Sequence, residues 1–345
     1  MTAITHSAGV DVLRAGAFEL LPRTYDEERG LCSFKAELVD GRLVQDWTSP
    51  YAVRYTITAL LGLHAAAHPR AEELTLRFLE KNRVDNRADI GLLTLLHCER
   101  GAYDDAEREL RRAEAAAEAQ LEMQELAWLL WGACAAAHAG LDGGEAVADA
   151  LLRRAAAHYV AQTGLARHSL RRHRRSIVSF GSLVYYLRAM HEASTLGRSD
   201  ADRLFRAGLE RVLAFQGPLG EWPWMFDVDR GLPFDRYPVF SVHQDSMAPL
   251  FLVPAVARNV EYAAGALERS VAWVHGRNEL GLRFYVDDPF FFAYRAIERA
   301  ERFQKARRYA RWVARTDAAA ASPGRLRVNR ECRSYHLGWV LYAWS

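Results

Sequence analysis

Three polar residues stand together in the segment "YPVFSVHQDSMAP". His243, Gln244 and Asp245 follow an aromatic loop and precede an apolar run that should begin a helix. A histidine and an aspartate at a helix start can act as general base and general acid, because the helix dipole and neighbouring groups shift their pKa values. Asp245 could instead cap the helix while His243 satisfies a backbone carbonyl. Both interpretations stay open, and we take His243 and Asp245 as candidate catalytic residues.

A second polar cluster lies in "NRECRSYHLGWVLYAW" near the end of the chain. If a helix begins near Glu331, then Cys332 and His336 share one of its faces, as do Glu331 and Tyr335. Glu331 and His336 are therefore further catalytic candidates. Glu331 and Arg333 could also form an ion pair, either structural or in the wall of a pocket.

Other residues could line the same pocket. Arg54 lies in the first turn of an expected helix between two tyrosines, and Glu279 lies in a tight loop. Each alone is more often a surface or capping residue, so only their convergence would be evidence of a site. The candidate substrate-binding residues are Arg54, Trp222, Trp224, Tyr237, Phe240, Gln244, Glu279, Arg333 and Tyr335.

The segment "RHSLRRHRR" (167–175) places five arginines and two histidines within nine residues. Such a cluster can neutralise a diphosphate, or it can be a solvated loop. The candidate diphosphate ligands are Arg171, Arg172, Arg174 and Arg175. The net charge is only +2 and no second basic stripe appears, so we expect a small-molecule substrate and no nucleic-acid partner.

Composition gives the broad class. The chain has 345 residues, of which half are hydrophobic, and no apolar run of about 18 residues that would span a membrane. The N-terminus lacks a secretory signal pattern, and the four cysteines are scattered without a CxxC pair. These features predict a cytoplasmic protein. They leave its oligomeric state open.

Helical periodicity dominates the chain. About a dozen helices are expected, most of them about 11–20 residues long and joined by short connections. Their expected ranges are 8–20, 50–67, 71–82, 88–99, 103–118, 121–139, 144–162, 176–196, 200–216, 244–275 (two helices), 289–314 and 333–344. Residues 25–47 are expected to form a small hairpin, because apolar and polar residues alternate there around glycines.

The absence of strand–helix alternation argues against a doubly wound sheet. An open solenoid would show a fixed repeat of about 33–45 residues, and none is found. We therefore predict an all-α fold: one domain, residues 1–345, in which the helices close into an (α/α)6 toroid. The long segments 25–47, 163–176, 217–243 and 276–289 would lie above its central cavity.

The segment "QGPLGEW" contains Gln216, Gly220 and Trp222 and resembles the glutamine–tryptophan motif of squalene cyclases and related terpenoid cyclases. In that family the glutamine caps an outer helix and the tryptophan packs over it. "DVDR" (227–230) resembles the first three positions of the family's Asp-x-Asp-Asp motif, with Asp229 as a proton donor, although Arg230 replaces the last acid. A hairpin turn capped by aspartates is the simpler explanation of "DVDR".

The resemblance implies a terpene cyclase-like enzyme that folds an isoprenoid against aromatic faces, with an acid that starts cyclisation. The zinc-binding protein prenyltransferases use Asp, Cys and His on such a toroid. Cys332 and His336 could supply two ligands, but the spacing does not reproduce theirs. We predict no metal or other cofactor, with zinc and magnesium left open.

The helix count alone also resembles sugar-processing (α/α)6 barrels of the acylglucosamine 2-epimerase type. The alternative is therefore a carbohydrate-active epimerase, lyase or hydrolase, in which His243, Asp245, Glu331 and His336 divide the acid and base roles. A mostly apolar cavity would favour the isoprenoid hypothesis, and a cavity crossed by carboxylates and histidines the sugar hypothesis. A helical scaffold without catalytic activity is a third possibility.

Overall fold

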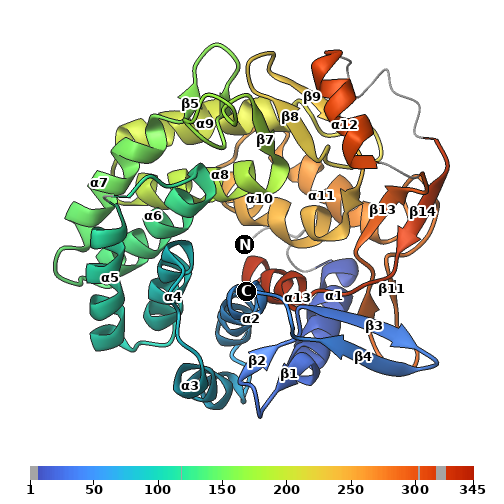
Figure 1. Cartoon of the computed structure of the whole chain (residues 1–345), viewed down its shortest axis with the longest axis horizontal. Coiled ribbons are helices and arrows are strands. Elements are labelled where there is room, and N and C mark those ends of the chain that lie inside the picture. Colours follow the sequence, from blue (N-terminus) through green and yellow to red (C-terminus); the bar gives the residue numbers. More distant parts are fainter. Residues whose placement is uncertain (1–6, 118, 302–303, 316–323) are drawn as a thin grey trace.

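A computed structural model of the chain describes residues 7–117, 119–301, 304–315 and 324–345. In these residues thirteen α-helices dominate, and short strands connect some of them (Figure 1). The helices are α1 (Ala8–Leu20), α2 (Ala52–Ala65), α3 (Ala71–Lys81), α4 (Arg87–Glu99), α5 (Tyr103–Ala117), α6 (Met123–His138), α7 (Gly144–Ala156), α8 (Phe180–Thr195), α9 (Ser199–Leu213), α10 (Ala248–Ala257), α11 (Ala263–Val274), α12 (Gln304–Val313) and α13 (Ser334–Ala343).

Twelve of the helices in the described part of the chain form two concentric rings. Helices α2, α4, α6, α8, α10 and α13 make the inner ring, in which each contacts the next and α13 returns to α2 (Figure 1). Helices α1, α3, α5, α7, α9 and α11 lie outside them. This arrangement confirms the predicted (α/α)6 toroid. No helix among the described residues has the length and apolar character that crossing a bilayer would require.

Glycines let the inner helices approach closely. A Cβ atom added to Gly62 of α2 would lie 2.2 Å from the carbonyl oxygen of Gly338 in α13. A Cβ atom added to Gly132 of α6 would lie 2.3 Å from the carbonyl oxygen of Gly91 in α4. Only a residue without a side chain fits such backbone contacts. The first of these contacts joins the two ends of the inner ring and so closes the barrel.

Strands in the described residues are short and pair in antiparallel fashion. The hairpin of β3 and β4 confirms the predicted N-terminal hairpin. The strands are β1 (Tyr25–Asp26), β2 (Leu31–Cys32), β3 (Lys35–Val39), β4 (Arg42–Asp46), β5 (Tyr159–Val160), β6 (Leu165–Ala166), β7 (Ile177–Ser179), β8 (Met225–Asp227), β9 (Leu232–Asp235), β10 (Val239–Phe240), β11 (Tyr285–Val286), β12 (Phe292–Ala293), β13 (Ala296–Arg299) and β14 (Leu326–Asn329).

One predicted helix is largely wrong. The range 289–314 contains strands β12 and β13, and only its last part is helical, as α12. Strand β13 lies between β10 and β14, so partners far away in sequence impose the extended conformation. Residues 302–303 of that range, and residue 118 of the predicted helix 103–118, lie outside the described residues.

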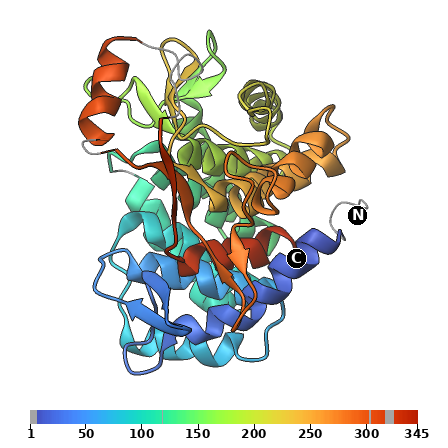
Figure 2. The ribbon, with the colours of Figure 1, turned by 90° about the vertical axis from the view of Figure 1, so that its right-hand side faces the viewer.

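Helix α12 belongs to neither ring. It packs beside strand β9, and Figure 2 shows it toward the same face of the barrel as the β3–β4 hairpin, on the left of that view. The inner helices α2, α6, α8 and α13 each have their N-terminal end at the cavity described below. Their N-terminal turns therefore surround it.

The glutamine–tryptophan segment is a packing contact between helices. The amide nitrogen of Gln216 donates to the carbonyl oxygens of Gly220 and Ala266, at 3.2 and 2.8 Å. The Trp222 indole nitrogen donates to the Ser270 hydroxyl at 2.7 Å, and the same hydroxyl accepts from Gln216 at 3.2 Å. These bonds join the end of α9 to α11. The segment therefore stabilises the barrel wall.

Candidate active site

A cavity of about 240 Å³ lies at the centre of the inner ring. Helices α2, α6, α8 and α13 present residues of their first two turns to it. Residues just before these helices, the turn His243–Met247 before α10 and the loop residue Trp224 complete the wall. The lining residues are Tyr51, Arg54, Tyr55, Thr58, Gln124, Trp128, Ser179, Gly181, Tyr185, Trp224, His243, Met247, Tyr335 and Trp339.

The lining follows the period of the helix. Residues four apart lie on one face of a helix, one turn above another. Five inner elements each contribute such a pair: 54 and 58, 124 and 128, 181 and 185, 243 and 247, and 335 and 339. Several helix N-termini therefore surround the cavity, and their backbone dipoles favour negative charge within it.

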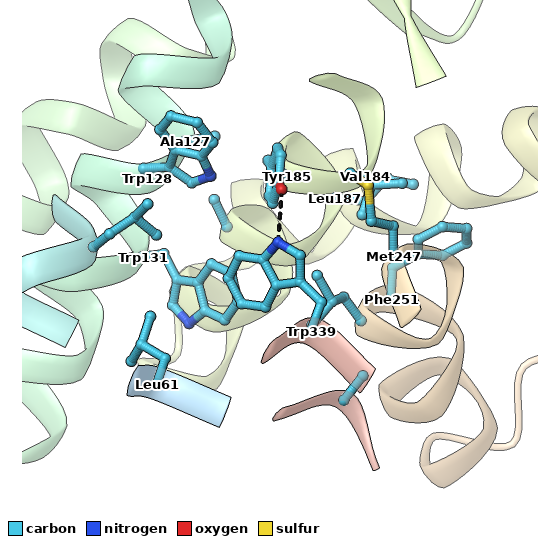
Figure 3. Packing of buried hydrophobic residues seen from close by; sticks show 14 of the residues in the cluster. Leu61, Ala127, Trp128, Trp131, Val184, Tyr185, Leu187, Met247, Phe251 and Trp339 are labelled. Carbon is cyan, nitrogen blue, oxygen red and sulfur yellow. Dashed lines mark hydrogen bonds between the residues drawn. The ribbon is translucent and has the colours of Figure 1, made fainter. Parts of the chain in front are cut away.

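Aromatic side chains line one part of the cavity, called its floor here, and Figure 3 shows Trp128, Tyr185 and Trp339 packed among other buried residues. Trp339 stacks on Trp131 with ring centres 5.6 Å apart, and its indole nitrogen donates to the Tyr185 hydroxyl at 2.9 Å. Trp128 meets Tyr185 edge to face at 5.0 Å. Burial raises the pKa of Tyr185, so its phenol stays protonated. The floor therefore offers flat apolar faces and one fixed hydroxyl.

Arg54 is the cation in the lining. Its Nε donates to Asp89 Oδ1 of α4 at 2.5 Å, and its guanidinium lies 4.6 Å from the ring centre of Trp128. Asp89 is buried, and this burial raises its pKa although Arg54 opposes the shift. Two neighbouring helices thus hold the Arg54 side chain in one orientation at the cavity.

His243 lies in the π-helical turn His243–Met247 that precedes α10. Its ring packs against Phe180 and Phe240, with centres 4.9 and 5.0 Å away. Its Nδ1 is buried and has no hydrogen-bond partner among the described residues. Burial, assisted by the nearby His336, lowers the pKa of His243 to about 3. The imidazole is therefore neutral at pH 7.

His336 and Asp245 form a buried pair next to His243. Nε2 of His336 lies 2.7 Å from Oδ1 of Asp245, and both side chains are buried. The Trp344 indole nitrogen donates to the Asp245 carbonyl oxygen at 2.6 Å and fixes that backbone. An ionised carboxylate only accepts hydrogen bonds, so it selects the tautomer with the hydrogen on Nε2.

The structure brings some predicted residues to the cavity and leaves others behind it. Arg54, Trp224, His243 and Tyr335 line the cavity, whereas Asp245 and His336 are not part of the lining. Phe240 lies just outside the wall, with its ring centre 5.5 Å from that of Trp224. Gln244 is fully buried and donates to the Phe240 carbonyl oxygen at 3.2 Å.

Glu331 and Arg333 belong to an ion-pair cluster beside Tyr335, outside the lining. Glu331 accepts from Arg333 at 2.6 Å and from Arg295 at 2.8 Å, which helps to lower its pKa although burial acts in the opposite direction. The Arg333 guanidinium also lies 4.1 Å from the ring centre of Phe34. The contact between Glu331 and Arg333 is therefore a structural ion pair and not part of the wall of this cavity.

Three other predicted binding residues stabilise loops that lie away from the cavity. Trp222 is bound to Ser270 as described above. The Tyr237 hydroxyl donates to Glu279 Oε1 at 3.2 Å, and the Trp273 indole nitrogen donates to Glu279 Oε2 at 2.9 Å. Their polar atoms are engaged within the protein, so a ligand in the cavity would not meet Trp222, Tyr237 or Glu279.

The arginine run 167–175 also lies apart from the cavity lining. Arg174 is paired with Glu122 at 2.8 Å, and the Arg175 carbonyl oxygen accepts from Arg167 at 3.1 Å. Arg171 lines a separate cavity of about 160 Å³. Neither Arg172 nor the other arginines of the run reach the lining described above.

The "DVDR" segment is a capped turn. Asp227 Oδ1 accepts from the backbone nitrogens of Asp229 and Arg230, at 3.0 and 3.1 Å. The carboxylate of Asp229 binds Ser176 and Arg167 on the outside of the barrel. Among the described residues no group of three or more His, Cys, Asp or Glu side chains is placed to hold a metal ion.

Sequence reasoning missed ten of the fourteen lining residues. Gln124, Trp128, Tyr185 and Trp339 were not candidates, because they lie in helices α6, α8 and α13, whose apolar residues look like ordinary core. The four-residue spacing of large aromatic residues near helix starts is the signal that could have found them.

Solved structures similar to this chain include carbohydrate-processing enzymes. The chain is similar to a sugar epimerase from a ruminal bacterium, with 13% identity, a TM-score of 0.65 and 97% of each chain covered. It is similar to a cellobiose 2-epimerase from Bacillus thermoamylovorans B4167, with 11% identity, a TM-score of 0.67, and 97% of this chain and 98% of that chain covered. It is also similar to an unsaturated glucuronyl hydrolase from Bacillus sp. GL1, with 12% identity, a TM-score of 0.60, and 97% and 96% covered.

No protein-family model matches the chain, and no curated protein matches it. Identities this low establish the fold alone. The similar structures named above are two sugar epimerases and a glucuronyl hydrolase, so they contradict the resemblance to terpenoid cyclases and protein prenyltransferases. The predicted isoprenoid substrate and cyclisation chemistry are therefore wrong. The misleading feature was the contact of Gln216 and Trp222, which serves packing.

Proposed function

We propose that this chain is a carbohydrate-active enzyme that moves a proton at the carbon next to the carbonyl group of a reducing sugar, as an epimerase or isomerase does. The observation that supports this best is the chemistry of the cavity wall. Within the described residues the wall contains His243 and Arg54 but no aspartate or glutamate. A neutral imidazole and a fixed guanidinium are suited to proton transfer.

The same wall argues against glycoside hydrolysis. Hydrolases of the common kind place two carboxyl groups on either side of the glycosidic bond. Here Asp89 is paired with Arg54, and Asp245 is hydrogen-bonded to His336, so both buried acids next to the cavity are already engaged within the protein. Similarity to two sugar epimerases agrees with this choice.

The proposed reaction starts from the open-chain form of an aldose. Neutral His243 removes the proton from C2, and the electron pair moves into the C1 carbonyl to give an enediolate. The Arg54 guanidinium and the surrounding helix N-termini stabilise the negative charge on the O1 oxygen. Return of the proton to C1, together with transfer of the O2 hydroxyl proton to O1, would give a ketose.

Return of a proton to the opposite face of C2 would give the epimer instead. That step needs a second donor on the other side of the sugar. His336, which Asp245 holds beside His243 but behind the cavity wall, would exchange its proton with His243 rather than with the sugar. The aromatic floor would pack against the C–H faces of the sugar. A cavity of about 240 Å³ is small for a ligand site and suits one sugar unit at a time.

The test is solvent exchange. We expect the protein to incorporate deuterium at C2 of a reducing hexose or disaccharide in D₂O, with an epimer or ketose appearing in the NMR spectrum. His243→Gln should abolish both signals. His138→Gln is the matched control, because His138 is exposed at the other end of α6.

Two outcomes would contradict the proposal. One is the release of an unsaturated uronate from an oligosaccharide without exchange in any reducing sugar, which would establish a hydrolase. The other is exchange that persists in His243→Gln, which would place the base elsewhere.

A further inference from the structure

Trp224 is a wall residue from a connecting loop rather than from the start of a ring helix. It precedes β8, and its ring lies between Phe240 on one side and Arg308 of α12 on another. The Arg308 guanidinium lies 4.0 Å from the centre of the Trp224 ring. This close cation–π contact links a helix outside the barrel to the cavity wall.

Asp235 holds both partners of this contact. Its backbone carbonyl accepts from the Trp224 backbone nitrogen at 3.1 Å. Its Oδ2 accepts from Arg308 Nε at 2.7 Å, and its Oδ1 accepts from Arg299 at 2.9 Å. The Asp235 carboxylate is buried, so these bonds are shielded from water. One residue thus fixes the backbone of Trp224 and the cation that covers its ring.

Trp224 is linked through Phe240 to His243, the proposed base. Trp224 meets Phe240 edge to face at 5.5 Å, and Phe240 meets the His243 ring edge to face at 5.0 Å. A displacement of Trp224 would therefore disturb the cavity wall and the packing of His243 together.

We infer that Arg308 is a positioning residue: through it, α12 holds the Trp224 ring at the angle at which a sugar packs against it. The inference rests on the proposed function for the identity of the ligand. The barrel itself closes without α12, so this helix serves the cavity wall rather than the rings.

Arg308→Ala is a suitable variant because it leaves Asp235 paired. Arg299 at 2.9 Å and Arg311 at 3.5 Å still neutralise the buried carboxylate. Arg308→Lys keeps the charge but loses the planar group that stacks on the ring. Arg307→Ala is the matched control on the same helix, since Arg307 is largely exposed and pairs with Glu301.

The ring can be observed directly in protein labelled with 5-fluorotryptophan. Each of the nine tryptophans gives a fluorine resonance, and the signal lost in Trp224→Phe identifies Trp224. We expect that signal to shift and broaden in Arg308→Ala and to stay unchanged in Arg307→Ala. An unchanged signal in Arg308→Ala would overturn the inference whether or not the protein acts on sugars.

Binding and turnover test the consequence. Titration with the reducing sugar that the wild type exchanges should give a Kd about tenfold higher in Arg308→Ala, with a smaller change in kcat and partial recovery in Arg308→Lys. A Kd equal to that of the wild type, with a displaced ring, would show that Trp224 does not position the sugar. If the wild type neither binds nor exchanges any reducing sugar, the proposed function fails, and the fluorine signal still decides the role of Arg308.

Discussion

His336 and Asp245 lie 91 residues apart in sequence, yet their side chains share a buried contact of 2.7 Å between Nε2 and Oδ1. The contact exists because the first turn of α13 meets the π-helical turn before α10. The π-helical turn places His243 and Asp245 on the same short segment, so His336 comes next to both. The barrel thus assembles two histidines and one acid from two distant polar clusters.

Asp245→Asn should lower kcat for proton exchange by about 100-fold with little change in KM. The amide can no longer select one tautomer of His336 as an ionised carboxylate does, and it does not stabilise an imidazolium. Asp200→Asn is the control, because Asp200 is an exposed acid on α9. Circular dichroism would confirm that the fold is retained. Wild-type kcat in Asp245→Asn would remove the pair from the mechanism.

The pH dependence of stability should report on His243. Its pKa is about 3 in the folded chain and 6.5 ordinarily, so the unfolded state binds the proton more readily. The resulting stabilisation is complete above pH 6.5 and decreases as the pH falls from 6.5 toward 3. The free energy of unfolding changes by at most on the order of 1 kcal/mol per pH unit over this range.

The measurement is the free energy of unfolding in urea between pH 7 and pH 4. His243→Gln should lose less stability over this interval than the wild type. His97 and His191, with pKa values lowered to about 4 by burial, act in the same direction, so His191→Gln serves as a comparison. Parallel curves for the wild type and His243→Gln would mean that His243 is charged in the folded protein.

Arg54→Met should lower kcat by about 100- to 1,000-fold, because the developing charge on the O1 oxygen would lose its cation. Asp89→Asn should have a smaller effect, since it frees Arg54 from one partner but leaves the guanidinium stacked on Trp128. Steady-state kinetics of the two variants separates these effects. Equal losses would mean that Arg54 serves mainly to compensate Asp89.

The fold was predictable because its determinants are local. Helix periodicity and the turn residues between helices gave most of the ring helices, and the lack of a repeat favoured closure. The strand at Ala296–Arg299 was not predictable in this way, since its conformation depends on pairing with Phe240 and Asn329 far away in the chain.

The candidate site was only partly predictable for a related reason. His243 and Arg54 stood out as polar residues at helix starts, and both line the cavity. Trp128 and Trp339 look like ordinary core residues in their helices, and only the closing of the ring shows that they form its floor. The resemblance carried by Trp222 misled because a packing contact was taken to indicate a reaction.

The last prediction concerns closure of the barrel. Gly62→Ala should destabilise the protein by about 3 kcal/mol, because the new Cβ would lie 2.2 Å from the Gly338 carbonyl oxygen and force α2 away from α13.

Gly265→Ala in α11 is the matched control. Its new Cβ would meet only the flexible end of Arg269, at 3.3 Å, and alanine favours a helix over glycine by up to about 1 kcal/mol. Urea denaturation compares the two variants. Since Thr58 and Trp339 lie on these same two helices, Gly62→Ala should also weaken sugar binding, whereas Gly265→Ala should not. Equal stability of the two variants would show that the inner ring is loose enough to absorb a methyl group at its closing contact.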